Sequence, residues 1–224
     1  MKNLWDLTDE PEKAPRVALS LPGIVKAAIA IADAEGVEAV SMQRVAADLG
    51  FTKMSLYRHV PGKAELLGLM IDTAVGTPPD LSQVPGGWRG KLENFVPRLA
   101  QVWQDHPWIP AMTMGARLMG PRETGWVESA VAATAGTPLT GDERLAAAFL
   151  IFGHVRTTHA TATAGTQPWS GGSEQVELIR SRADLFPELA MALTEPAPTL
   201  RDNARQFGLA RILDGLAALI AERS

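Results

Sequence analysis

The stretch from Ser41 to Leu67, SMQRVAADLGFTKMSLYRHVPGKAELL, constrains the fold of this chain more than any other. Ser41 suits a helix N-cap, because its hydroxyl can accept a hydrogen bond from an otherwise unpaired backbone N–H. Apolar residues then recur at positions 42, 45, 46 and 49, which is the spacing of one helical stripe. Gly50 stands where a helix ends in a left-handed residue, and Thr52 can cap a second helix that runs to about His59. Two short helices joined by a tight turn with glycine predict a helix-turn-helix, whose second helix enters the major groove of DNA.

The same window is basic in an otherwise acidic chain. Residues 41–63 contain four basic residues against Asp48 alone, a net charge of +3, whereas the whole chain carries −4. Phosphate contacts dominate the affinity of proteins for DNA, so a basic island on the predicted second helix is the charge pattern that such contacts need. The helix pattern and the charge pattern therefore point to the same function.

The segment TKMSLYRHVPGKAELL also resembles the recognition-helix segment of the TetR family of bacterial transcriptional regulators. The upstream segment LPGIVKAAIAIADAEGVEAVSMQRVAADLG is similar to the family's first two helices, so the resemblance covers residues 20–76. In the remainder of the chain the resemblance is architectural only. The residues that match the family's recognition segment in register are Leu56, Tyr57, His59, Lys63, Leu66 and Leu67.

The resemblance implies which side chains meet DNA. The residues at positions that face base edges are Gln43, Lys53, Met54 and Ser55. Those at positions that face phosphates are Tyr57, His59 and Lys63. The predicted set is completed by Thr52, by Arg44 and by Arg58, where each arginine could serve either task. Glutamine can pair with adenine and lysine with guanine in the major groove, and an exposed methionine suits a thymine methyl group, so the chemistry agrees with these roles.

The sequence divides into three parts. Residues 1–19 carry two prolines among many charges and are predicted to be a flexible arm. The basic residues of that arm either reach DNA or are simply solvated, and the sequence leaves both open. Residues 20–76 form the predicted DNA-binding domain, including the helix that connects it to the rest. Residues 77–224 form the predicted effector-binding and dimerisation domain, after a loop rich in glycine and proline.

The periodicity beyond the first domain is helical, so the predicted fold class is all-α: a three-helix DNA-binding domain with a helix-turn-helix, then a larger helical domain. Apolar residues at 3–4 spacing predict long helices at 88–105, 141–164 and 202–222. Pro97 is expected to kink the first of these, because proline removes a helical hydrogen bond. Shorter helices are expected at 110–118, 122–135, 174–183 and 185–194.

One short recognition helix reads only a few base pairs, so two copies are needed. Dimers of such units bind half-sites about 34–36 Å apart, which implies a palindromic double-stranded operator. By the family resemblance, the helices at about 141–164 and 202–222 form a four-helix bundle with those of a second chain. The alternative is that both apolar stripes are core within one chain.

The larger domain is rich in methionine and aromatic residues, which can line an adaptable apolar pocket. For any one of these residues the alternative is ordinary core. Taken together they predict a small apolar or aromatic effector. The candidate pocket residues are Trp103, Trp108, Met112, Met119, Trp126, Phe149, Phe152 and His154.

The sequence argues against several functional classes. The absence of cysteine excludes disulfides, thiolate metal sites and cysteine nucleophiles. No apolar run reaches the ~18–20 residues of a membrane span, and the acidic start does not suit a signal peptide, so we expect a cytoplasmic protein without a membrane partner. No GxSxG, HExxH, Walker or GxGxxG signature occurs, which argues against an enzyme, a metal site or a cofactor. The predicted function is a ligand-responsive repressor, and the sequence does not separate it from a constitutive or activating DNA-binding regulator.

Overall fold

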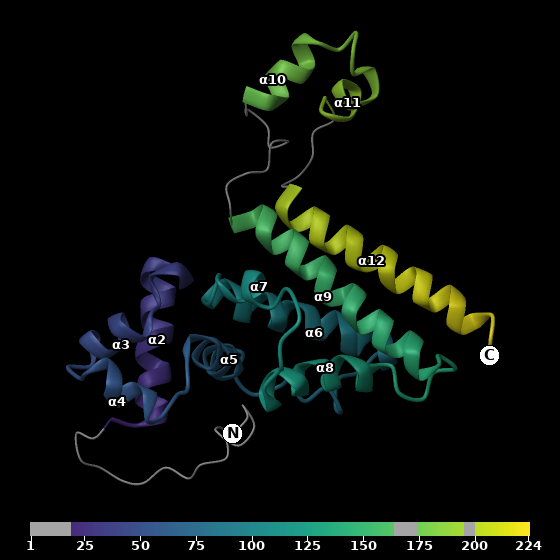
Figure 1. The fold of residues 1–224 in the computed structure, drawn as a ribbon. Helices are drawn as coiled ribbons and strands as arrows, with labels where there is room; N and C mark the ends of the chain where they lie inside the picture. Colours follow the sequence, from purple (N-terminus) through teal and green to yellow (C-terminus); the bar gives the residue numbers. More distant parts are fainter. Residues whose placement is uncertain (1–18, 164–173, 195–199) are drawn as a thin grey trace. The chain divides into compact units, whose positions relative to one another are not determined.

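The computed structural model describes residues 19–163, 174–194 and 200–224. Within these ranges the chain is helical and contains no strand, which confirms the all-α prediction (Figure 1). It divides into two compact units, of which the first ends at Thr137 and the second begins at Pro138. None of the described helices combines the length and the hydrophobicity of a membrane span. The arm predicted at residues 1–19 lies outside the described residues, except for its last residue.

The first unit begins with three short helices, α2 (Leu21–Glu35), α3 (Met42–Asp48) and α4 (Lys53–Tyr57). A 3-10 turn, η1 (Val37–Ala39), joins α2 to α3 and was not predicted from the sequence. The three helices share one apolar core, as the periodicity predicted. Its fully buried side chains include Ile24, Ala28, Val40, Val45 and Leu56.

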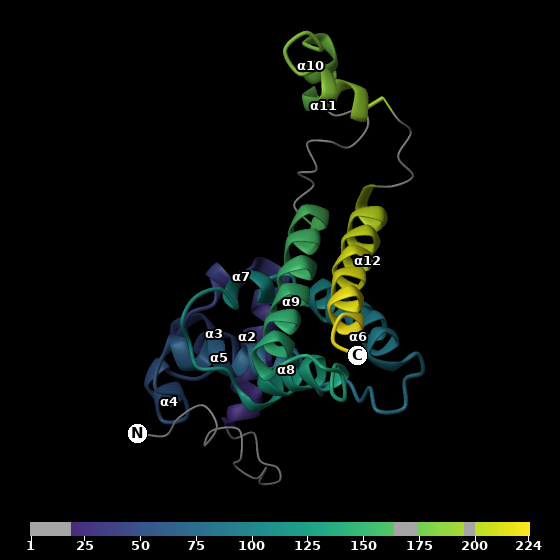
Figure 2. The ribbon, with the colours of Figure 1, turned by 90° about the vertical axis from the view of Figure 1, so that its right-hand side faces the viewer.

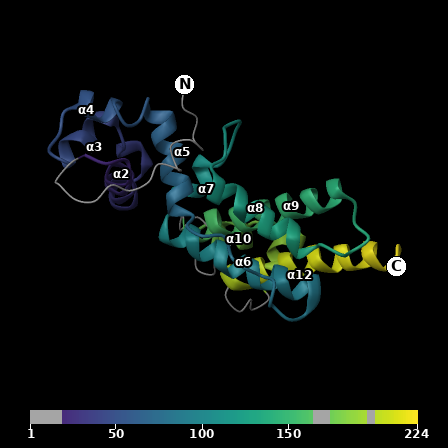
Figure 3. The same ribbon diagram turned by 90° about the horizontal axis from the view of Figure 1, so that it is seen from below.

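Helix α5 (Lys63–Ala74) lies between these three helices and the rest of the first unit (Figure 3). It packs against α2 on one side and against α8 (Pro121–Ala133) on the other. Its buried side chains include Leu66, Leu69, Met70 and Ile71. Helix α5 therefore connects the helix-turn-helix to the helices that follow.

Helix α6 (Gly87–Asp105) packs against α8, and Pro97 lies inside it as predicted. The next helix, α7, contains only Ile109–Met112, so the prediction of a helix over 110–118 is wrong. Thr113 Oγ1 donates a hydrogen bond to the carbonyl oxygen of Pro110 at 3.0 Å, and the left-handed glycine at position 115 stops the helical run.

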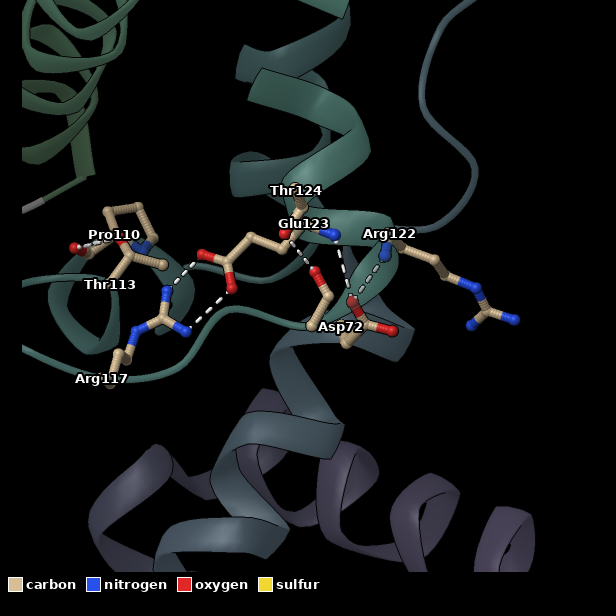
Figure 4. A network of polar contacts seen from close by, with 8 residues as sticks. Asp72, Pro110, Thr113, Arg117, Arg122, Glu123 and Thr124 are labelled. Carbon is tan, nitrogen blue, oxygen red and sulfur yellow. Dashed lines mark hydrogen bonds and ion pairs between the residues drawn. The ribbon is translucent and has the colours of Figure 1, made fainter. Parts of the chain in front are cut away.

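A buried carboxylate joins α5 to α8 (Figure 4). Gly120, the N-cap residue of α8, has no side chain that could accept hydrogen bonds from the first turn. Asp72 of α5 takes this role, because its Oδ1 accepts hydrogen bonds from the backbone N–H groups of Arg122 at 2.8 Å and Glu123 at 3.1 Å. The approach is so close that a Cβ at position 120 would overlap the Asp72 carboxylate. One helix thus caps another across 50 residues of sequence.

Three further contacts fix the start of α8. The indole N–H of Trp126 donates to the carbonyl oxygen of Val75 at 3.0 Å, directly after α5. The Trp126 ring also packs edge-on against Phe95 of α6, with 5.6 Å between the ring centroids. The Glu123 carboxylate forms a bidentate ion pair with Arg117, in the loop before α8 (Figure 4). The end of α5 and the first two turns of α8 are therefore held together at several points.

The second unit contains α9 (Gly141–Thr163), α10 (Glu174–Ser181), α11 (Pro187–Ala192) and α12 (Leu200–Ala221). Helices α9 and α12 run side by side (Figure 1 and Figure 2). At one end of this pair, Arg223 donates two hydrogen bonds to the Glu143 carboxylate, at 2.6 and 2.8 Å. Further along, His154 Nε2 lies 2.9 Å from the carbonyl oxygen of Arg205. The short α11 begins at proline, which suits the first position of a helix.

Candidate nucleic-acid interface

Hydroxyl caps at both N-termini hold the helix-turn-helix formed by α3 and α4. Ser41 Oγ accepts a hydrogen bond from the backbone N–H of Arg44 at 3.1 Å, and Thr52 Oγ1 accepts one from Ser55 at 3.3 Å. Between the two helices Gly50 has a φ of 74°, a left-handed conformation that other residues rarely adopt. The caps and the turn are therefore as the sequence predicted, although α4 ends at Tyr57 rather than near residue 59.

Helix α4 is anchored by one face and presents the other to solvent. Leu56, on α4, and Val60, just after it, are fully buried. Met54 is 71% exposed and Tyr57 is 39% exposed. The Lys53 ammonium lies 5.6 Å from the centroid of the Tyr57 ring, within the range of a cation–π contact. The exposed face of α4 is thus cationic and aromatic, with one long apolar side chain.

The predicted DNA-binding residues all lie between the start of α3 and the first residue of α5, with Thr52 as the N-cap of α4. Eight of the ten are exposed, and the other two, Ser55 and His59, are half-buried. Ser55 Oγ shares a hydrogen bond with Thr52 Oγ1 at 2.9 Å, which fixes the first turn of α4. The set is therefore accessible from solvent, while its contacts with DNA remain a prediction.

Arg44 is already paired within the protein. Its Nη1 donates to Glu35 Oε2 at 2.9 Å and its Nη2 donates to Glu35 Oε1 at 2.6 Å. These hydrogen bonds lower the pKa of the Glu35 carboxyl and raise the pKa of the Arg44 guanidinium. Sequence reasoning missed Glu35, because no local pattern indicates that the last residue of α2 meets the first turn of α3.

A second carboxylate connects α2 to the corner between α6 and α7. Asp33 Oδ1 accepts a hydrogen bond from the indole N–H of Trp108 at 2.7 Å and lies 2.9 Å from His106 Nδ1. Trp108 is 6% exposed, so its N–H needs an acceptor inside the protein. The first helix of the DNA-binding region is therefore tied directly to the residues that follow α6.

The candidate pocket residues fall in both compact units. Those in the first unit are Trp103, Trp108, Met112, Met119 and Trp126, and those in the second are Phe149, Phe152 and His154. The polar atoms of Trp108, Trp126 and His154 have the partners within the chain described above. Phe149 and Phe152 lie near each other, with 6.5 Å between ring centroids. The assignment of these residues to an effector pocket stays a prediction.

The first unit also carries an open groove of about 410 Å³. It is lined by residues 78–82, by Lys91 of α6 and by four residues of α8 between positions 128 and 133. None of the candidate pocket residues lines this groove. Among the described residues, no three histidine, aspartate or glutamate side chains are grouped as metal ligands.

Comparisons with known proteins agree with this architecture. A family model described as "Bacterial regulatory proteins, tetR family" matches residues 24–70, and a model described as "Tetracyclin repressor-like, C-terminal domain" matches residues 79–220. The chain is 35% identical to the HTH-type transcriptional repressor DrrR1 of Streptomyces coeruleorubidus. That match covers 98% of this chain and 85% of the relative.

Solved structures share the fold. The crystal structure of apo ActR from Streptomyces coelicolor matches with a TM-score of 0.79 and 23% identity, covering 95% of this chain and 100% of ActR. ActR in complex with actinorhodin matches with a TM-score of 0.74 and 23% identity, covering 92% of this chain and 99% of ActR. At this identity the structural matches support the fold alone.

Proposed function

The chain belongs to the TetR family of bacterial transcriptional regulators, and we propose from this premise that it is a dimeric repressor which a small molecule releases from a palindromic operator. One observation carries the DNA-binding part. Helix α4 is anchored by the buried Leu56 while Lys53, Tyr57 and Arg58 remain exposed on it or directly after it. A recognition helix needs this division between an anchored face and an accessible cationic face.

The proposed DNA contacts fall into two groups, contacts with base edges and contacts with phosphates. Gln43 and the N-terminal residues of α4 face base edges, where Lys53 can donate to guanine and Met54 can contact a thymine methyl group. Tyr57, His59 and Lys63 face phosphates, which position the protein without reading sequence. Arg44 can contact DNA only when its guanidinium separates from the Glu35 carboxylate.

The dimer is proposed to form through α9 and α12. Phe149 is 53% exposed, Leu150 54% and Phe207 62%, although all three lie on the two longest helices of the second unit. Large exposed apolar side chains on neighbouring helices are typical of an interface with another chain. A two-fold symmetric dimer supplies two copies of α4, one for each of two successive major grooves.

The effector is proposed to be a small apolar or aromatic molecule held among the candidate pocket residues. The relative ActR has been crystallised with actinorhodin, which supports this class for a protein of the same fold. Release then needs only that the ligand binds more tightly to a form whose two α4 helices are mis-spaced for adjacent grooves. We expect the protein to act in the cytoplasm, where its DNA is.

Selection of bound duplexes from a random pool tests the DNA-binding proposal. The full-length protein should enrich a palindrome whose half-sites are about one helical turn, 34–36 Å, apart. Enrichment of no sequence would refute specific DNA binding, and enrichment of a single, non-palindromic site would refute the symmetric dimer. Native mass spectrometry of the purified protein then reveals any co-purified small molecule. If that molecule leaves the affinity for the selected operator unchanged at saturation, release by that molecule is refuted.

A further inference from the structure

The ion pair between Glu35 and Arg44 lies at the edge of the proposed DNA-reading surface. Arg44 stands in the first turn of α3, next to Gln43, and Glu35 is the last residue of α2. The side chain of Arg44 is 43% exposed and that of Glu35 is 46% exposed, so a DNA backbone could approach both of them. Any duplex that approaches Arg44 therefore approaches Glu35 as well.

The geometry of the pair neutralises the arginine. Both terminal nitrogens donate to one carboxylate, which is the bidentate arrangement that a phosphate would also form with a guanidinium. The Glu35 carboxylate and a phosphate would therefore compete for the same two donors. While Arg44 is paired with Glu35, the pair adds no net charge to the surface. Salt-dependent affinity for DNA comes from cations that replace counterions on phosphates, and a neutral pair replaces none.

We propose that Glu35 withholds Arg44 from DNA and thereby lowers the sequence-independent affinity of the reading surface. The inference rests on the proposed place of Arg44 at the DNA interface. Arg44 is released only where the bound DNA offers acceptors that outcompete the carboxylate, as a well-fitted operator does. The hydrogen bonds from Arg44 also lower the pKa of the Glu35 carboxyl, in keeping with an ionised partner for the guanidinium.

This arrangement improves discrimination between the operator and non-specific DNA. A genome offers a vast excess of non-specific sites, so the ratio of specific to non-specific affinity decides occupancy of the operator. A carboxylate that weakens every non-specific encounter, and yields only at the operator, raises that ratio. The opposite role, in which Glu35 positions Arg44 for phosphate contact, predicts the opposite sign for loss of the carboxylate.

The probe is a duplex of random sequence and about 30 base pairs, because phosphate binding does not depend on sequence. Full-length wild type and Glu35→Gln are titrated by fluorescence anisotropy between about 50 and 200 mM salt. We expect Glu35→Gln to bind about three- to fivefold more tightly per reading head at about 100 mM salt, and this advantage should shrink at higher salt because the salt slope is steeper by about 0.9 per head. Tighter binding by wild type than by Glu35→Gln would overturn the proposal.

Two matched comparisons separate withholding from a simple change in charge. Glu38→Gln makes the same change in net charge on an exposed side chain of η1, three positions along the chain. It should change affinity and slope much less than Glu35→Gln, and an equal effect would overturn the proposal. Arg44→Gln should weaken binding more in the Glu35→Gln background than in wild type, whereas equal losses would show that the two residues act independently.

Failure of the inference is distinguishable from failure of the proposed function. If wild type binds neither random nor selected duplexes, the proposed function fails; if it binds both but the Glu35 and Glu38 variants behave alike, only this inference fails. Circular dichroism checks that each variant is folded. If Glu35→Gln does not fold, the test uses the side-chain NMR signal of Arg44 in the wild-type protein instead. Its chemical shift should change when the selected operator is added and should not change when the random duplex is added. Movement with both duplexes would overturn the proposal.

Discussion

The indole N–H of Trp108 donates a hydrogen bond to the Asp33 carboxylate at 2.7 Å, across 75 residues of sequence. This bond joins the first helix of the DNA-binding region to the corner between α6 and α7. Trp108 is buried, so loss of the Asp33 carboxylate leaves its indole N–H without the acceptor that it has in the folded protein. The contact therefore contributes both to stability and to the rigid attachment of α2.

Asp33→Ala should lower the free energy of unfolding by about 1–3 kcal/mol, because it leaves a buried donor unpaired. Asp33→Asn keeps a carbonyl oxygen for the indole and should lose less. Urea unfolding followed by circular dichroism measures both. Equal stability of Asp33→Ala and wild type would show that the bond contributes nothing in solution.

Asp72 and Gly120 should show coupled effects on stability. Asp72→Ala removes the acceptor that caps α8 and should cost about 0.5–2 kcal/mol, the usual value for loss of a helix cap. Gly120→Ala should also destabilise the protein, because the new Cβ overlaps the Asp72 carboxylate. In the double variant the overlap with the carboxylate is removed and only the contact with the Cβ of residue 72, at 2.7 Å, remains, so the combined loss should be smaller than the sum of the two single losses. Simple additivity would contradict the close contact.

The Glu143 carboxylate should titrate far below its ordinary range. Hydrogen bonds from Arg223 and from the backbone N–H of Thr140 lower the pKa of Glu143 from 4.5 to about 2. A group whose pKa is depressed by folding stabilises the folded state above its unfolded pKa, and this contribution is lost as the pH falls from about 4.5 towards 2. Carboxyl NMR should follow this titration, and Arg223→Gln should move it back towards 4.5. An unchanged midpoint in Arg223→Gln would contradict the ion pair.

The proposed division between base readers and phosphate contacts predicts two kinds of loss. Lys63→Ala should weaken binding to all duplexes to a similar degree and reduce the salt slope by about 0.9 per reading head. Gln43→Ala should instead relax the preference at one base pair of the selected operator, by about 1–3 kcal/mol. Binding to single-base variants of that operator separates the two. If Lys63→Ala altered the preference at one base pair alone, the assignment would be reversed.

The dimer proposal predicts that one charge on the exposed face of α9 separates the chains. Phe149→Asp should convert the protein to a monomer in sedimentation equilibrium and weaken operator binding, since one head then reads one half-site. Leu118→Asp is a suitable control, because Leu118 is 59% exposed but belongs to the other compact unit. Loss of the dimer in both variants, or in neither, would argue against an interface through α9.

Local sequence signals were sufficient for the helix-turn-helix. A hydroxyl before each helix, a glycine in the turn and an apolar stripe act over a few residues, and the structure contains all of them. The long helices were predicted within a few residues for the same reason. The helix predicted over 110–118 was wrong, because the left-handed conformation of Gly115 does not allow the helical run to continue.

The tertiary contacts were not predictable in this way. Asp33, Glu35 and Asp72 are ordinary acidic residues in the sequence, and each finds its partner on another helix or loop. Their roles depend on how helices meet, which periodicity does not encode. The fold was therefore predictable from the sequence, while the side chains that link its helices were not.

The double attachment of α5 to α8 means that the C-terminal end of α5 follows any movement of α8. Asp72 and the carbonyl group of Val75 bind the first two turns of α8, whereas the opposite end of α5 follows directly after the residues that end the reading helix. A helix of 12 residues is about 18 Å long, so a tilt of α5 by about 10° about its C-terminal end displaces its N-terminal end by about 3 Å. That distance equals the length of a hydrogen bond. A rotation of α8 that tilts α5 by this amount would therefore be enough to move a base-reading side chain out of register with its operator.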